Sequence, residues 1–142
     1  MDIIEFVDAF NNKSDVELVK LAIHATKNLF NYFESVNVSG DEQAGFLIDL
    51  FKLFVSADRY VSEQEYGLFL RLINETPDYL SPSQFYGMTN GGADKEFVDS
   101  MINKIKALPE EAKLNAVSIG LAIICIDHEV TMPEYDIIYK IL

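Results

Sequence analysis

Apolar residues recur along most of the chain at steps of three and four residues, the spacing of one face of an α-helix. A helix is expected over 15–35, where Ser14 just before it and Glu17 in its first turn have the spacing of a capping box. Asp41 is expected to cap the next helix. No stretch shows the sustained alternation of a β-strand. The pattern predicts an all-α fold, a single helical bundle of about seven helices over residues 1–142. In 15–35 it predicts an inward face formed by Val16, Val19, Ile23, Leu29, Phe30 and Phe33.

The stretch 44–57 is apolar around most of the helix circumference, and the apolar run Val117–Ile126, interrupted by Ser118 and Gly120, also suits a buried helix. A helix of this kind is buried in the middle of a bundle. Each stretch is followed by an Asp-x-x-Val corner and then by a second helix, expected at 62–74 and from residue 132 to the end. The shared unit is therefore a buried helix, a tight corner and a capped helix.

The two units align at a constant offset of 69 residues, with Asp58 on Asp127 and Glu65 on Glu134. The same offset superposes further positions: Val61, Ser62, Tyr66 and Arg71 fall on Val130, Thr131, Tyr135 and Lys140. We interpret this as an internal repeat that relates two helix pairs by a pseudo-twofold axis. Each tyrosine is expected to pack under its corner, with its hydroxyl group on a carboxylate.

The chain has the length of one domain and is 49% hydrophobic, which suffices for a core. No apolar run approaches the roughly 18–20 residues that cross a bilayer, so direct membrane insertion is not expected. The acidic start lacks the basic region of a signal peptide, and the lone Cys125 excludes an intrachain disulfide. These features favour a cytoplasmic protein.

The net charge is −12, from 11 basic and 23 acidic residues. Nucleic-acid and anionic-membrane binding need clustered Lys and Arg, so the charge disfavours both. It favours a divalent cation or a protein partner with a basic surface. Alternatively, the charge only maintains solubility.

The segments Ala57–Glu65, ADRYVSEQE, and Ile126–Glu134, IDHEVTMPE, resemble the signature of the TerB-like family, named for a tellurite-resistance protein. That signature is an apolar helix, an Asp-Gly corner, a hydrophobic residue, Ser or Thr, and Glu three residues later. The corner glycine is replaced here by Arg59 and His128.

The resemblance implies a single TerB-like helical domain without catalytic activity, in tellurite or chemical-stress responses. It also implies a divalent-metal site, for Mg²⁺, Mn²⁺ or Ca²⁺. Carried over residue by residue, the metal ligands are Asp58, Glu65, Asp127 and Glu134.

The same residues have a purely structural interpretation. Both glutamates complete a Ser/Thr-x-x-Glu capping box, and both aspartates are suited to hold a corner through backbone N–H groups. The two interpretations are compatible, because a capping carboxylate keeps a free oxygen. A true EF-hand is excluded, because Phe54 and Ile123 would occupy the first ligand position. A weaker site of two to four carboxylates and water remains.

The resulting hypothesis is a binding or adaptor domain whose acidic face takes a divalent cation, a basic partner surface, or both. Two alternatives remain open. One is a small metal-dependent hydrolase that uses the same carboxylates as acid and base. The other is a helical module that only oligomerises. The oligomeric state does not follow from the sequence.

Overall fold

The computed structural model describes residues 3–55, 63–72, 94–126 and 132–142, and single positions at 83, 85 and 87. These residues form seven α-helices and no strand, which confirms the predicted all-α class. The helices are α1 (Ile3–Asn11), α2 (Asp15–Ser35), α3 (Gly40–Val55), α4 (Glu63–Leu72), α6 (Lys95–Lys106), α7 (Glu110–Cys125) and α8 (Met132–Ile141).

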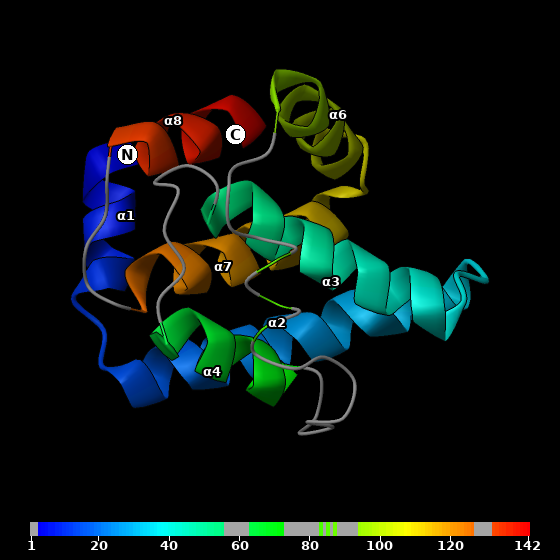
Figure 1. The fold of residues 1–142 in the computed structure, drawn as a ribbon, viewed down its shortest axis with the longest axis horizontal. Coiled ribbons are helices and arrows are strands. Elements are labelled where there is room, and N and C mark those ends of the chain that lie inside the picture. The colour runs from blue at the N-terminus through cyan, green and yellow to red at the C-terminus, as the bar shows by residue number, and fades with distance from the viewer. Residues whose placement is uncertain are drawn as a thin grey trace.

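Helix α7 lies at the centre of the bundle, where it packs against α1, α2, α3, α6 and α8 (Figure 1). Every residue from Ile119 to Ile126 is buried. This confirms the burial predicted for the apolar run Val117–Ile126. Among the described helices, none is both long enough and apolar enough to cross a bilayer.

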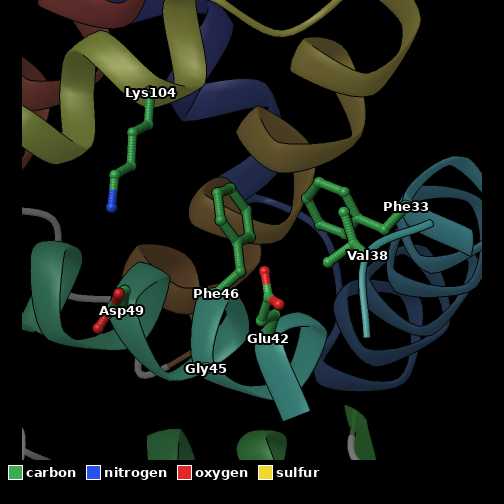
Figure 2. A pocket seen from close by; sticks show the side chains of 7 residues that line it. All are labelled: Phe33, Val38, Glu42, Gly45, Phe46, Asp49 and Lys104. Atoms are coloured by element: carbon green, nitrogen blue, oxygen red, sulfur yellow. The ribbon is translucent and has the colours of Figure 1, made fainter. Parts of the chain in front are cut away.

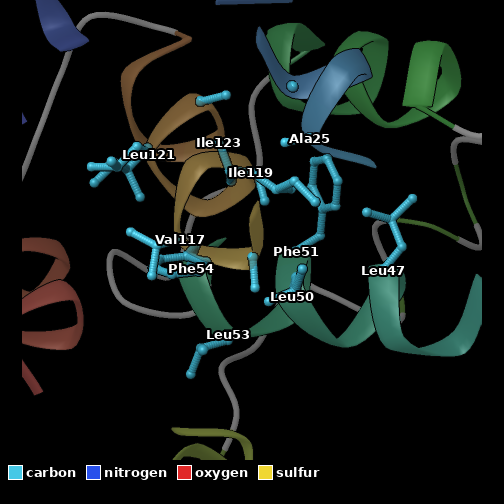
Figure 3. Packing of buried hydrophobic residues seen from close by; sticks show 14 of the residues in the cluster. Ala25, Leu47, Leu50, Phe51, Leu53, Phe54, Val117, Ile119, Leu121 and Ile123 are labelled. Carbon is cyan, nitrogen blue, oxygen red and sulfur yellow. The ribbon is translucent and has the colours of Figure 1, made fainter. Parts of the chain in front are cut away.

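Helix α3 is the second helix predicted to be buried, and it packs directly against α7 (Figure 3). The ring of Phe54 is fully buried at this contact. A Cβ atom added to Gly120 would collide with that ring, so glycine allows the two helices to approach closely. The buried apolar residues of α3 are Leu47, Ile48, Leu50, Phe51, Leu53 and Phe54.

The buried face of α2 differs from the expected one. Val16 is exposed, whereas Ala22 and Ala25 are buried among the residues that face the core. Helices α2 and α7 pack along much of their lengths, and small side chains at the contact permit this. Because packing and not hydrophobicity decides which residues face α7, the expectation for Val16 was wrong. The buried apolar residues of α2 are Leu18, Ala22, Ala25, Leu29 and Phe33.

The first two caps are formed by serine. At α2 the predicted capping box is present: the Glu17 N–H donates to Ser14 Oγ at 3.2 Å, and the Ser14 N–H donates to Glu17 Oε1 at 3.3 Å. At α3 the Glu42 N–H donates to Ser39 Oγ at 3.2 Å. Ser39 is therefore the cap. Asp41, the expected cap, lies in the first turn instead, because the helix begins at Gly40.

The bounds and lengths of the described helices can be compared with the 69-residue offset of the repeat. Helices α4 and α8 are both ten residues long and begin and end at equivalent positions, and α3 and α7 are both 16 residues long. The pseudo-twofold relation between the two pairs stays a prediction.

Candidate functional site

Two of the four predicted metal ligands lie in helices that the structure describes. Glu65 is the third residue of α4, and Glu134 is the third residue of α8. Each side chain is only 2% exposed, and each interacts with other groups of the chain. The other two ligands, Asp58 and Asp127, lie outside the described residues.

The burial of these two glutamates sets them apart from others in the same position. Glu17 and Glu42 are also the third residues of their helices, and both are exposed. A carboxylate in a capping box needs no burial, and burying one is costly unless it is paired. Burial of Glu65 and Glu134 therefore points to a role in addition to capping.

Both acid-bearing helices begin at the same end of the bundle. Helices α3 and α7 end there, and α4 and α8 start there, at the left of Figure 1. Helix α7 lies between α4, which packs on α2, and α8, which packs on α1, α6 and α7. Within the described ranges no group of three or more His, Cys, Asp or Glu side chains could hold a metal ion. The four-carboxylate site, half of which falls outside those ranges, stays a prediction.

The tyrosine that follows Glu134 joins the last helix to the first. The Tyr135 hydroxyl donates to Asp8 Oδ1 at 2.9 Å, so α8 is tied to α1. Burial raises the pKa of Tyr135, and the hydrogen bond and charge of Asp8 raise it further. The expected carboxylate partner is thus present for this tyrosine, but it comes from α1 and not from the corner. Tyr66 packs its ring on Phe85, with the ring centroids 5.3 Å apart.

The structure also shows a pocket that the sequence did not suggest. Its volume is about 330 Å³, and it lies where the α2–α3 turn and the first half of α3 face α6 (Figure 2). The residues that line it are Phe33, Val38, Glu42, Gly45, Phe46, Asp49 and Lys104.

One wall of this pocket is formed by the turn that ends α2. The Val38 N–H donates to the Phe33 carbonyl at 2.9 Å, and the Asn37 N–H donates to the Glu34 carbonyl at 3.1 Å. This is a Schellman motif, and Asn37 occupies its left-handed position with φ of 64°. The motif brings the Val38 and Phe33 side chains together on the pocket wall.

Two further contacts hold the turn against α3. The buried Gln43 side chain donates from Nε2 to the Val38 carbonyl at 2.9 Å. The Phe33 and Phe46 rings pack edge to face, with centroids 5.1 Å apart. The apolar part of the pocket therefore has a defined shape.

The polar part of the pocket contains two carboxylates and one ammonium group. Asp49 is partly buried, and this burial raises the pKa of its carboxyl group, while the charges of Lys104 and Lys52 oppose the rise. Lys104 extends from α6 toward the Asp49 side of the pocket (Figure 2). Lys52 lies 4.5 Å from the centre of the Phe97 ring, which links α3 to α6.

The sequence contains a pattern that could have indicated part of this pocket. Glu42, Gly45, Phe46 and Asp49 have the spacing of one helix face, and the spacing is visible in the printed sequence. Lys104 could not be predicted as a pocket residue from the sequence, because only the packing of α6 on α3 brings it to the pocket.

No protein-family model, curated protein or solved structure matches this chain. A function for this chain is therefore inferred from its own residues.

Proposed function

We propose that this chain is a non-catalytic, cytoplasmic binding domain of the TerB-like type. It binds a divalent cation at the starts of α4 and α8 and uses its negative charge to attract a basic protein partner. The observation that supports the proposal is the burial of Glu65 and Glu134, each 2% exposed, at the same position of two helices of equal length.

The ligands of the cation are the carboxylates of Asp58, Glu65, Asp127 and Glu134. Carboxylate oxygens and water are the ligands that Mg²⁺, Mn²⁺ and Ca²⁺ prefer. Because α7 lies between α4 and α8 (Figure 1), we favour one two-carboxylate site at each helix start over a single shared site. Such sites keep several waters and bind weakly, which suits Mg²⁺ or Mn²⁺.

Thermal unfolding tests the cation site. Metal-free protein is compared with protein in 1 mM Mg²⁺, Mn²⁺ or Ca²⁺, for wild type, D58N, D127N and the double variant. At a metal concentration ten times the Kd, each of the two sites is expected to add about 1.4 kcal/mol of stability, or about 4 °C in Tm. Each single variant is expected to lose part of this rise, and the double variant all of it.

The matched control is the E17Q/E42Q double variant, which removes two exposed glutamates from the same helical position. It is expected to keep the full metal-dependent rise. A Tm that does not respond to metal, or one that responds equally in D58N/D127N, would contradict the cation site. A complete loss of the rise in either single variant would instead indicate one shared site.

The basic partner is supported by the net charge of −12. Association of this kind weakens as salt screens the charges. A pull-down at 50 and 300 mM NaCl is expected to capture basic proteins only at the lower concentration. Capture that does not depend on salt would contradict an electrostatic partner.

A further inference from the structure

The pocket beside the α2–α3 turn has carboxylates at both ends of one helix face. Glu42 and Asp49 are seven residues apart on α3, or about 10 Å along the helix axis. Gly45 and Phe46 lie between them. In Figure 2 the Glu42 carboxylate and the Phe46 ring both point into the pocket.

Gly45 keeps the floor of the pocket open. A glycine inside a helix costs about 0.5–1 kcal/mol relative to alanine. Packing does not require it here, because a Cβ atom at Gly45 would have no other atom within 4 Å. The missing side chain instead leaves room between the two carboxylates. Gly67 in α4 has equally open surroundings but lies outside the pocket, so it provides a matched control.

The rest of the pocket lining beside these carboxylates is mostly apolar and aromatic. Phe33, Val38 and Phe46 form this apolar part, and the two rings are fixed edge to face. An aliphatic stem can pack against it, and an aromatic ring attracts a cation placed over its face. The volume of about 330 Å³ is at the lower end of the range for small-ligand pockets.

The charges of the lining favour a positive ligand. Glu42 and Asp49 outnumber the single Lys104, so the lining has a net charge of −1. Asp49 is partly buried and therefore gains from an added positive charge. Lys104 offsets part of the negative charge, so it opposes the binding of a cation.

We propose that this pocket binds a guanidinium or primary ammonium group carried on an apolar stem, as in an arginine or lysine side chain of a basic partner protein. The cationic group lies between Glu42 and Asp49 over the Phe46 ring, and the stem packs on Phe33 and Val38. The inference shares the basic partner with the proposed function but does not depend on a metal at α4 or α8.

The test is a titration followed by ¹H–¹⁵N NMR in EDTA, so that metal binding has no influence. The probes are Nα-acetyl-arginine-N-methylamide, which represents a side chain in a protein, and agmatine, which represents a free amine. Saturable shifts are expected at Phe33, Val38, Gly45 and Phe46. Tighter binding of Nα-acetyl-arginine-N-methylamide than of agmatine would assign the site to a protein partner, and the reverse would overturn that assignment.

Substitutions of the lining residues test whether the pocket prefers a positively charged ligand. E42Q and D49N are each expected to weaken binding about fivefold or more, because each removes a charged hydrogen-bond acceptor. K104M is expected to strengthen it about threefold, because it removes a repelling charge. G45L is expected to abolish binding by filling the floor.

Three of the four variants have a control that leaves the pocket unchanged: E17Q for E42Q, K106M for K104M and G67L for G45L. The controls are expected to bind like wild type, and thermal unfolding of every variant verifies folding. Absence of saturable shifts, binding unaffected by E42Q and D49N, or weaker binding in K104M would overturn the proposal. Such a result together with intact metal stabilisation would leave the cation sites at α4 and α8 standing.

Discussion

Four helix starts in the molecule share one capping sequence but differ in their surroundings. Four helices begin with Ser or Thr, two intervening residues and Glu, and each of these glutamates is the third residue of its helix. At α2 and α3 the glutamate is exposed and the serine cap bonds are made. At α4 and α8 the glutamate is buried.

The difference shows that a capping motif determines where a helix begins but not how deep its carboxylate lies. Capping uses backbone N–H groups within three residues of the cap, so it is local. Burial depends on which other helices pack around that start. An exposed glutamate can be lost at little cost, whereas loss of a buried one leaves its interaction partner and a cavity behind.

The largest expected effect concerns the buried carboxylates. Glu65→Ala and Glu134→Ala are each expected to destabilise the fold by about 3 kcal/mol, because truncation leaves the buried groups that interact with the carboxylate unpaired. Glu42→Ala at the exposed helix start is expected to cost far less. Urea denaturation measures the stability of all three variants, and equal losses would remove the distinction between the buried and the exposed glutamates.

The next effect concerns the backbone of the α2–α3 turn. Asn37 has φ of 64°, a conformation that β-branched residues avoid. Asn37→Val is therefore expected to cost about 1–2 kcal/mol, whereas Asn37→Gly is expected to be neutral or stabilising. Chemical denaturation of the pair checks this, and a Val variant as stable as the Gly variant would show that the turn is not held in this conformation.

A smaller effect concerns the cap of α3. Ser39→Ala removes the acceptor of the Glu42 N–H and is expected to cost about 1 kcal/mol. Ser39→Asp is expected to restore stability, because aspartate is an equally good cap. The melting temperatures of the three proteins test this, and a loss in the Asp variant as large as in the Ala variant would argue against a capping role.

The smallest expected effect concerns the dependence of folding stability on pH through the pocket residue Asp49. Burial raises the pKa of Asp49 in the folded state, so the folded protein binds its proton more tightly than the unfolded chain does. Ionised Asp49 therefore lowers stability above the raised pKa, and this penalty disappears as the pH falls below the ordinary value near 3.8. Asp49→Asn is expected to be more stable than wild type at pH 7, by no more than about 0.5 kcal/mol. The difference is expected to vanish at pH 3, which paired urea melts at the two pH values measure.

The local features of the fold were predictable from particular residues. Ser14 and Glu17 predicted the start of α2, and the apolar run before Asp127 predicted that α7 is buried. Both features depend on residues close together in the chain, so the pattern was sufficient. Asp41 was a wrong choice of cap because two capping residues stand close together there, and only the position of the first helical turn separates them.

The features that were not predictable depend on contacts between distant segments. Val16 is more hydrophobic than Ala22, yet Ala22 is buried because it lies on the face of α2 turned toward the core, where α7 packs. Lys104 joins Glu42 and Asp49 only because α6 crosses the face of α3. The Asp8 partner of Tyr135 comes from the first helix of the chain.

The sequence by itself determined the helices, the Ser14 cap of α2 and the two long apolar segments in the core, since these follow from propensity, capping and periodicity over a few residues. Only the tertiary structure decided which of four equivalent glutamates are buried, and only it placed a lysine opposite two carboxylates. The physical reason is that burial and charge environment are properties of packed helices, and a residue's surroundings are supplied by segments that its own neighbours in the sequence do not specify.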